Sequence, residues 1–323
     1  MLTDTFGRRF YYLRLSITDV CNFRCQYCLP DGYQCEHDRQ FLSLDEISRT
    51  VRGFARLGTE KVRITGGEPA LRKDLPEIIS RCKQTPGINT VALTTNGFNM
   101  DSQYQHWFDA GLDALNISID SFEPRQFAAI TGKDKLDSIL SAIDNALTTG
   151  FSQIKINTVL MREYNAHDLQ QFFNYVKDKP ISLRFIELMK TGDNGDFYQR
   201  QHVSGQQLKN QLLANGWIQQ VRDKTAGPAE VYRHPDYRGT IGLIMPYAKD
   251  FCASCNRLRI SSLGKLHLCL FSDQGLDIRQ YLQSDDTREF EQQLVALLQD
   301  KKVSHFLHDG YSGATKHLSM LGG

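Results

Sequence analysis

Apolar and polar residues alternate along several short stretches of the chain. Between positions 10 and 18, Leu13, Leu15 and Ile17 alternate with polar residues, a pattern that is typical of a β-strand with two different faces. Similar stretches predict five more strands, over residues 61–65, 90–95, 114–120, 153–160 and 182–188.

Apolar residues at helical spacing separate these strands. Residues 43–46, Ser-Leu-Asp-Glu, form a capping box, and Ile47, Val51 and Phe54 follow on one helix face. Further helices are predicted over residues 74–83, around 106–108, and over 136–148, 168–177, 204–214 and 286–298.

The alternation of strands and helices up to residue 188 predicts parallel βαβ units. Six strands are fewer than the eight of a complete (β/α) barrel, so we expect an α/β fold with a partial, open (β/α)6 TIM-type barrel. Gly192 to Asp196 predict a loop and a boundary between a barrel domain, 1–190, and a C-terminal domain, 191–323. Short strands and turns are expected over residues 217–270, with a hairpin turn at 262–264.

Five of the predicted strands carry polar residues on one face, whereas strands that are buried on both faces are almost wholly apolar. The polar residues are Arg14, Ser16, Lys61, Arg63, Thr94, Asn116, Ser118, Lys155 and Asn157. These faces could be solvated edges of the sheet. Their repetition favours a barrel lumen that holds a polar ligand.

Three cysteines, Cys21, Cys25 and Cys28, directly follow the first predicted strand. A structural zinc ion takes four protein ligands, and a typical iron–sulfur cluster takes four thiolates. Three thiolates leave one metal position open. In this CxxxCxxC order the stretch resembles the radical S-adenosylmethionine superfamily, in which the open iron of a [4Fe–4S] cluster binds S-adenosylmethionine.

Cys252, Cys255 and Cys269 form a second set of three thiols. By its spacing alone, this set fits equally well a zinc site completed by His267 and an iron–sulfur cluster. The first set favours a second cluster with another open iron. Cys35 and Cys82 match no ligand spacing, and for His305, His308 and His317 we expect structural roles.

Isolated cations accompany the second set of cysteines. Arg257 and Arg259 lie two residues apart and therefore share one face of a predicted strand. Together with Arg14, Arg63 and Lys155, they predict a site for a small polyanion such as a nucleoside triphosphate. Residues 66–69, Gly-Gly-Glu-Pro, lie between a strand and a helix, where glycines allow close approach to a ligand and the carboxylate can receive an ammonium group.

Composition adds few constraints. Lys and Arg total 38 and Asp and Glu total 37, so the formal charge of +1 predicts no general attraction to nucleic acid or membranes. No apolar run approaches the roughly 20 residues of a membrane span, and the first ten residues lack the apolar core of a signal peptide. We therefore expect a cytoplasmic protein whose thiols stay reduced.

Nearly the whole chain resembles the GTP 3′,8-cyclase family of molybdenum cofactor biosynthesis. The chain also ends in Gly322-Gly323, as this family does. The resemblance rests on residues 13–19, 21–28, 63–69, 94–97, 116–120, 154–159, 185–189 and 251–259.

The resemblance implies two [4Fe–4S] clusters, S-adenosylmethionine as cofactor and GTP as substrate. It places the first cluster on Cys21, Cys25 and Cys28, and the second, whose open iron takes the guanine base, on Cys252, Cys255 and Cys269. The implied S-adenosylmethionine pocket consists of Tyr27, Gly67, Ser118 and Met189. The implied GTP site consists of Arg14, Arg63, Thr94, Lys155, Arg257, Leu258 and Arg259. Arg257, Arg259, Gly322 and Gly323 are implied to act in catalysis.

The implied reaction begins with a 5′-deoxyadenosyl radical, which removes the ribose 3′ hydrogen of GTP. A bond between C3′ and C8 then gives (8S)-3′,8-cyclo-7,8-dihydroguanosine 5′-triphosphate. The implied partners are a reductant such as flavodoxin or ferredoxin and a downstream cyclic pyranopterin monophosphate synthase, and the protein would be a monomer or homodimer. Val20 and Lys190 replace the arginine and proline usual in the family, and we expect only local effects on loop geometry.

Two alternatives differ in class. A peptide-modifying radical enzyme would normally carry more cysteines in its second domain than the three found after Gln153. A non-catalytic zinc-binding interaction module would lack iron. Iron and sulfide counts on anaerobically purified protein distinguish the zinc module from the cluster enzymes.

Overall fold

The computed structural model describes residues 1–34, 40–221, 223–272 and 275–311, and residues 313, 319 and 321. At its centre, strands β1 to β6 pair in parallel, each with the next along the chain. Their bounds are Tyr12–Ser16 (β1), Lys61–Thr65 (β2), Thr90–Thr95 (β3), Ala114–Ser118 (β4), Gln153–Leu160 (β5) and Ser182–Glu187 (β6). Each lies within a predicted stretch, so the six strand predictions are confirmed.

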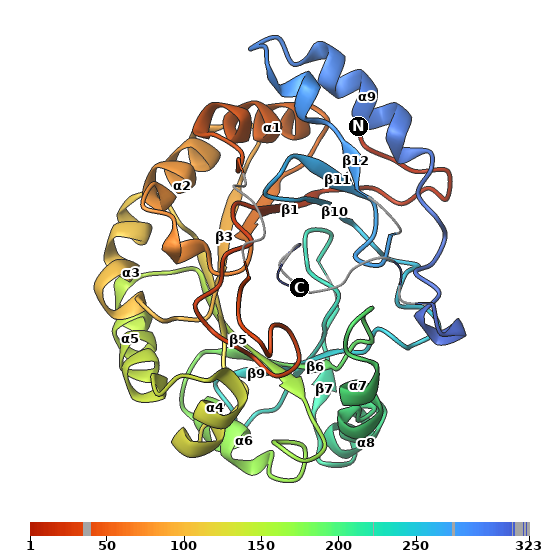
Figure 1. Ribbon diagram of the computed structural model, residues 1–323. Helices are drawn as coiled ribbons and strands as arrows, with labels where there is room; N and C mark the ends of the chain where they lie inside the picture. The colour runs from red at the N-terminus through yellow and green to blue at the C-terminus, as the bar shows by residue number, and fades with distance from the viewer. Residues whose placement is uncertain are drawn as a thin grey trace.

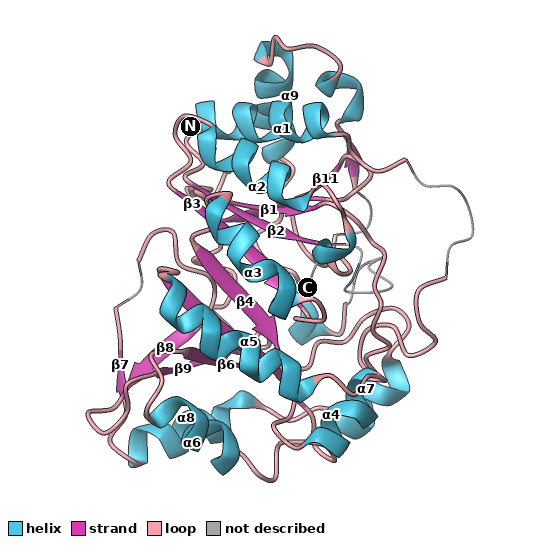
Figure 2. Ribbon diagram, turned by 90° about the vertical axis from the view of Figure 1, so that its left-hand side faces the viewer, coloured by secondary structure: helices cyan, strands magenta, loops and turns pink. Residues whose placement is uncertain are grey.

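Helices surround these strands on the outside (Figure 1), and α2, α3 and α5 cover one side of the sheet in Figure 2. The helices are Leu44–Arg56 (α1), Leu75–Gln84 (α2), Met100–Asp109 (α3), Pro124–Thr131 (α4), Leu136–Thr149 (α5) and Gln170–Lys177 (α6). The apolar pattern does not predict α4, a helix of 8 residues that begins at a proline and is capped by the Glu123 side chain. A helix this short shows few turns of apolar periodicity.

Strands from the C-terminal part extend the same sheet at both edges. β10 pairs in parallel with β1, and β9 pairs in parallel with β6. The full order is β12-β11-β10-β1-β2-β3-β4-β5-β6-β9-β8-β7, and within the described ranges the outermost strands do not pair, so the barrel stays open. The added strands are Ile218–Gln219 (β7), Glu230–Arg233 (β8), Thr240–Ile244 (β9), Arg257–Ile260 (β10), Lys265–His267 (β11) and Leu276–Asp277 (β12).

The predicted hairpin at 262–264 is confirmed, because β10 and β11 pair antiparallel around it. The predicted domain boundary at 190/191 stays a prediction, with strands from both sides of it hydrogen-bonded in one sheet. The remaining elements are Gly195–Gln201 (α7), Gly205–Ala214 (α8), Arg288–Leu298 (α9) and the 3-10 turns Pro69–Leu71 (η1), Arg279–Leu282 (η2) and Leu307–Asp309 (η3). The helix α7 begins inside the stretch predicted as a loop.

Side chains on the strands divide between two buried environments. Leu13, Val62 and Leu115 are fully buried in the main apolar core. Their polar neighbours Arg14 and Lys61 are also buried, each only 8% exposed. The alternative of solvated sheet edges is therefore wrong for these two strands. The lumen is polar, and its predicted polar ligand stays a prediction.

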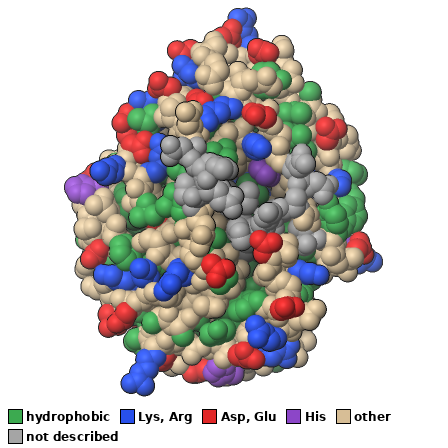
Figure 3. Space-filling model, in the orientation of Figure 1, with side chains coloured by type: hydrophobic (Ala, Val, Ile, Leu, Met, Phe, Trp, Pro, Cys, Tyr) green, Lys and Arg blue, Asp and Glu red, His purple; other side chains and the backbone are tan. Residues whose placement is uncertain are grey.

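The outer surface carries both signs of charge, and acidic and basic side chains are interspersed on the face shown in Figure 3. None of the helices in the described ranges has the length and apolar character that crossing a membrane requires.

Glu46 ties α1 to the C-terminal part of the chain. Its carboxylate accepts hydrogen bonds from Ser43 N at 2.8 Å and from the Arg279 guanidinium at 2.7 and 3.0 Å. The Ser43 hydroxyl in turn accepts from Glu46 N, which completes the predicted capping box. Burial opposes ionisation of Glu46, but Arg279 and Ser43 outweigh it and lower the pKa of Glu46 to about 2.

We predict that Glu46→Gln lowers the free energy of unfolding at pH 7 by about 1.5–3 kcal/mol, because charge-assisted hydrogen bonds are lost. A depressed carboxyl pKa stabilises the fold above the unfolded value of 4.5 and loses this effect as the pH falls toward 2. The difference between wild type and variant should therefore shrink between pH 7 and pH 4. Denaturant titrations at several pH values measure this difference in unfolding free energy, and the exposed Glu77→Gln serves as the control. A difference that does not change with pH would contradict this account.

Candidate active site in the barrel lumen

The strand register places three arginines in one row inside the barrel. Arg14 on β1 lies opposite Arg259 on β10 and opposite Arg63 on β2. All three are buried. Because residues two apart on a strand share a face, Arg257 and Lys61 extend the same positive surface one step earlier along β10 and β2.

The pKa of Tyr12 shows how strongly this positive surface favours negative charge. It lies between Arg257 and Lys61 in the register. Its burial opposes ionisation, but the charges of Arg63, Arg14 and Lys61 outweigh burial and lower the pKa of Tyr12 to about 8. The positive charge of the lumen therefore stabilises even the ionised form of the Tyr12 hydroxyl.

Two further cations enter the lumen from β5 and β6. Burial, followed by repulsion from Arg184, Arg63 and Lys61, lowers the pKa of Lys155 to about 5. Burial and Arg63 likewise lower the pKa of Arg184 to about 10. A bound anion would relieve this repulsion and favour the charged forms.

Several of these side chains have a buried polar atom without a hydrogen-bond partner in the described part of the chain. Buried polar groups in proteins are normally hydrogen-bonded, so these atoms indicate a ligand site. They are Nε of Arg63, Arg184, Arg257 and Arg259, and Oγ1 of Thr94.

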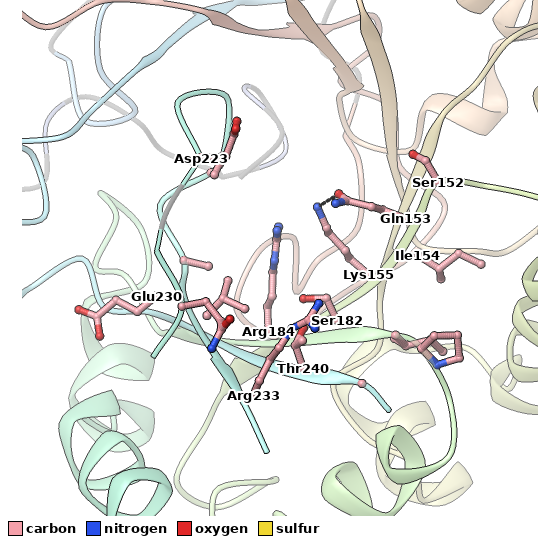
Figure 4. Close-up of a pocket in the computed structure, with 18 of the residues that line it drawn as sticks. Ser152, Gln153, Ile154, Lys155, Ser182, Arg184, Asp223, Glu230, Arg233 and Thr240 are labelled. Atoms are coloured by element: carbon pink, nitrogen blue, oxygen red, sulfur yellow. Dashed lines mark hydrogen bonds between the residues drawn. The ribbon is translucent and has the colours of Figure 1, made fainter. Parts of the chain in front are cut away.

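A cavity of about 940 Å³ opens where β2, β3, β5, β6 and β9 begin. Its charged lining includes Lys61, Lys155 and Arg184, and Figure 4 shows Lys155 and Arg184 directed into it, with Lys155 hydrogen-bonded to Gln153. Arg233 and Arg238 add positive charge at its rim, and Asp223 and Glu230 add negative charge.

A second, smaller cavity contains the second set of cysteines. Cys252, Cys255 and Cys269 line it together with Arg257 and Arg259. Arg14, Arg63 and Arg184 line it as well. The remaining walls are mainly apolar or aromatic and include Phe251, Pro228, Leu268 and Phe271. Arg184 lines both cavities, so the two meet inside the barrel.

The first set of cysteines follows β1 and rests against the Gly-Gly-Glu-Pro turn. Gly67 N donates to Thr18 O at 2.9 Å, and Glu68 N donates to Val20 O at 2.7 Å. A Cβ atom at Gly67 would lie 2.3 Å from Val20 O. This close backbone contact explains why the second glycine is needed.

Side chains from neighbouring strands hold the same loop. Tyr27 donates to the Asp120 carboxylate at 2.9 Å, and Asn96 Nδ2 lies 4.0 Å from Cys21 Sγ. The Glu68 carboxylate accepts from the Thr95 hydroxyl at 2.7 Å and from Asn96 N at 2.6 Å. Glu68 thus links the β2 turn to β3, and its predicted contact with a ligand ammonium stays a prediction.

The thiols fit iron–sulfur clusters. Burial raises the pKa of Cys21, Cys25 and Cys252, and iron would stabilise the thiolates that burial disfavours. Burial also acts on Cys255, but Arg257 and Lys301 outweigh it and lower its pKa to about 6.

A zinc ion and a cluster require different arrangements of their ligands. A single zinc ion needs its ligand atoms to converge on one point, whereas the cysteines of a cluster bind different irons. Among the described residues, no three His, Cys, Asp or Glu side chains converge in that way. His267, the fourth zinc ligand considered above, is absent from the lining of the second cavity.

A small apolar cluster bridges the two sets of cysteines. It consists of Leu270, Phe271, Leu307 and Leu321. Cys28 of the first set and Cys269 of the second both pack against it, as does Met189.

The remaining predicted site residues differ in placement. Leu258 alternates with the two arginines of β10, and its side chain lies in the main core, so only its backbone can face the lumen. Ser118 ends β4, and Gly322 and Gly323 lie outside the described residues. Arg184 was missed, although it alternates with Leu183 and Phe185 as the other lumen cations do with their neighbours.

Two protein-family models cover most of the chain. Residues 15–176 match the radical SAM superfamily, and residues 181–307 match the Molybdenum Cofactor Synthesis C family. The fold also resembles the crystal structure of SuiB from Streptococcus suis bound to S-adenosylmethionine, with a TM-score of 0.61 and 12% identity over 90% of this chain and 68% of that one. This likeness concerns the fold alone.

Curated relatives match over the full length. The GTP 3′,8-cyclase of Yersinia pestis is 56% identical, and the alignment covers 100% of this chain and 99% of that protein. The GTP 3′,8-cyclase of Vibrio parahaemolyticus is 55% identical over 99% of this chain and 97% of that protein. With this identity over its whole length and with both family models, the chain belongs to the GTP 3′,8-cyclase family of radical S-adenosylmethionine enzymes.

Proposed function

We propose that this protein converts GTP into (8S)-3′,8-cyclo-7,8-dihydroguanosine 5′-triphosphate, the first step of molybdenum cofactor biosynthesis. The names of its relatives support this activity. The observation that carries it here is the buried row Arg259, Arg14 and Arg63, beside a cavity that contains three cysteines. A triphosphate matches the charge of this lumen.

Cys21, Cys25 and Cys28 would hold the first [4Fe–4S] cluster, and Cys252, Cys255 and Cys269 the second. Tyr27, Gly67, Ser118 and Met189 would line the S-adenosylmethionine pocket. When bound, the reduced first cluster and S-adenosylmethionine supply the radical that removes the ribose 3′ hydrogen, after which C3′ bonds to C8 of guanine.

The two cavities suggest how GTP lies. Lys61, Lys155 and Arg184 would bind the phosphates in the larger cavity, because all three line it and both Lys61 and Arg184 repel the charge of Lys155. The base would occupy the second cavity beside the cysteines, against its apolar walls Phe251, Leu268 and Phe271. The ribose would then lie near Arg14, Arg63 and Thr94, and Arg257 and Arg259 would bind the nucleotide beside the second set of cysteines. This position keeps the reacting carbons away from water.

Gly322 and Gly323 would reach the active site, since Leu321 belongs to the apolar cluster against which Cys28 and Cys269 pack. We further propose a flavodoxin or ferredoxin as reductant, cyclic pyranopterin monophosphate synthase as the downstream enzyme, and a cytoplasmic monomer or homodimer. The free thiols among the described cysteines suit a reducing compartment.

The activity has a direct test. Anaerobically reconstituted protein with dithionite, S-adenosylmethionine and GTP should yield 5′-deoxyadenosine and a cyclised nucleotide in matched amounts, measured by chromatography and mass spectrometry. Formation of 5′-deoxyadenosine that does not depend on GTP, or no formation at all, would refute the proposal.

Arg257→Ala should weaken GTP binding by about 1.5–3 kcal/mol, because a buried charge-assisted contact is lost. S-Adenosylmethionine affinity should stay within about twofold, since Arg257 belongs to the second cavity. Isothermal titration under anaerobic conditions measures both affinities. The exposed Arg125→Ala is the matched control, and equal losses for both ligands in Arg257→Ala would argue against this assignment.

Gly67→Ala should disturb the first cysteine loop, because the new Cβ would lie 2.3 Å from Val20 O. We expect iron to fall from roughly eight to roughly four atoms per chain, with the second cluster retained. The control Gly195→Ala adds a Cβ with no atom within 4 Å and should keep its iron. Full iron content in Gly67→Ala would show that the loop tolerates this displacement.

A further inference from the structure

Arg8 is a buried cation that lines neither of the two cavities described above. It belongs to the segment before β1, in which Thr3 and Arg9 form an antiparallel bridge. Its Nε donates to the Asp4 carboxylate at 2.6 Å, and the Asp4 side chain is fully buried. A buried ion pair is costly unless further hydrogen bonds satisfy its other groups, so the partners of the remaining Arg8 N–H groups are informative.

The other nitrogens of Arg8 donate to main-chain carbonyls from two distant parts of the chain. Nη1 donates to Cys252 O at 3.1 Å and to Val303 O at 2.8 Å. Nη2 donates to Lys302 O at 2.7 Å. One planar guanidinium thereby joins a cysteine of the second set to the segment that follows α9.

Lys301 makes a second connection between this segment and the same set of cysteines. It is only 5% exposed, and its Nζ donates to Leu268 O, next to Cys269. The two residues that follow Lys301 supply carbonyls that Arg8 binds. Residues 301–303 are therefore joined to both parts of the second set.

Neither part of this set lies within a regular element. Cys252 belongs to a turn before β10, and Cys269 follows the end of β11, so no strand pairing holds either cysteine. Cys252 O also accepts from Cys255 N at 3.1 Å. Arg8 thus binds the carbonyl that closes the turn between these two cysteines, and groups that orient metal ligands strongly affect how firmly the metal is held.

A simpler role for Arg8 would be to anchor the start of the chain. That start is held by other contacts, because Leu2 N donates to Leu57 O at 3.0 Å and both Leu2 and Phe10 are buried in the main core. The Arg8 side chain is therefore not needed to attach this segment. Its bonds act instead on Cys252 and on residues 302 and 303.

We propose that Arg8, together with Lys301, keeps Cys252 and Cys269 in place to bind the second iron–sulfur cluster. This inference rests on the proposed function, because it takes the second set of cysteines as cluster ligands. Arg8 is a positioning residue, since it acts through the main chain of Cys252.

The test follows iron loss from the anaerobically reconstituted holoenzyme of Arg8→Lys to an iron chelator. Lysine keeps a positive charge beside Asp4, but its compact ammonium cannot replace a planar fork that reaches several carbonyls. Iron of the second set should be lost about tenfold faster than in wild type, and iron of the first set at an unchanged rate. EPR spectra of reduced samples distinguish the two sets, because S-adenosylmethionine should change only the signal of the cluster that binds it.

Two further variants sharpen the result. Lys301→Met keeps most of the aliphatic side chain but removes the donor to Leu268 O, so it should also accelerate iron loss from the second set alone. The matched control Arg9→Lys makes the same exchange at the adjacent, exposed arginine and should leave both rates unchanged.

Equal acceleration at both sets in Arg8→Lys would show a general loss of stability and overturn the inference. Unchanged rates at both sets would overturn it as well. A wild-type enzyme with only roughly four irons per chain, or with zinc on the second set, would instead refute the second cluster of the proposed function, and the Arg8 inference with it. The two failures are therefore distinguishable from the wild-type measurement alone.

Discussion

The lumen depends on one constraint, the burial of like charges side by side. Parallel pairing of β10, β1 and β2 places Arg259, Arg14 and Arg63 in one row. Each buried cation loses hydration, and each neighbour adds repulsion. Such a row is tolerated where an anionic ligand compensates it. Stability of the barrel and affinity for a polyanion are thus linked, because a ligand that binds only the folded lumen also stabilises it.

The pairing of β1 with β10 sets the distance between the two sets of cysteines. The first set of cysteines follows the carboxyl end of β1, whereas Cys252 and Cys255 precede the amino end of β10, and the two strands are parallel. At about 3.3 Å per residue, the four residues of β10 span roughly 13 Å. A nucleotide that lies parallel to the strands, and so crosses the arginine row, would extend from one end toward the other. The lumen cations of β1 and β10 line the path between them.

The alternation of apolar and polar residues was sufficient to predict the six barrel strands and the polar lumen, because this alternation is a property of each strand by itself. It was insufficient for α4 and α7, which are too short for clear periodicity. The buried position of His305 could not be recognised from its neighbours in sequence. Its burial comes from Phe251 and Phe271, which lie more than thirty residues earlier in the chain and meet it only through tertiary packing. Residues in irregular segments carry no periodic signal that would reveal such contacts.

Charge is also segregated along the lumen, and this decides which ligand each cysteine set suits. The buried carboxyls Glu68 and Asp120 act on Cys21 and Cys25, where they raise the thiol pKa values together with burial. At the other end, Arg257 and Lys301 lower the pKa of Cys255. S-Adenosylmethionine carries a sulfonium and an ammonium group, whereas GTP is a polyanion. The acidic end therefore favours the former and the basic end the latter. Exchanging the two ligands would place cations beside buried arginines and phosphates beside buried carboxyls, and both arrangements are electrostatically unfavourable.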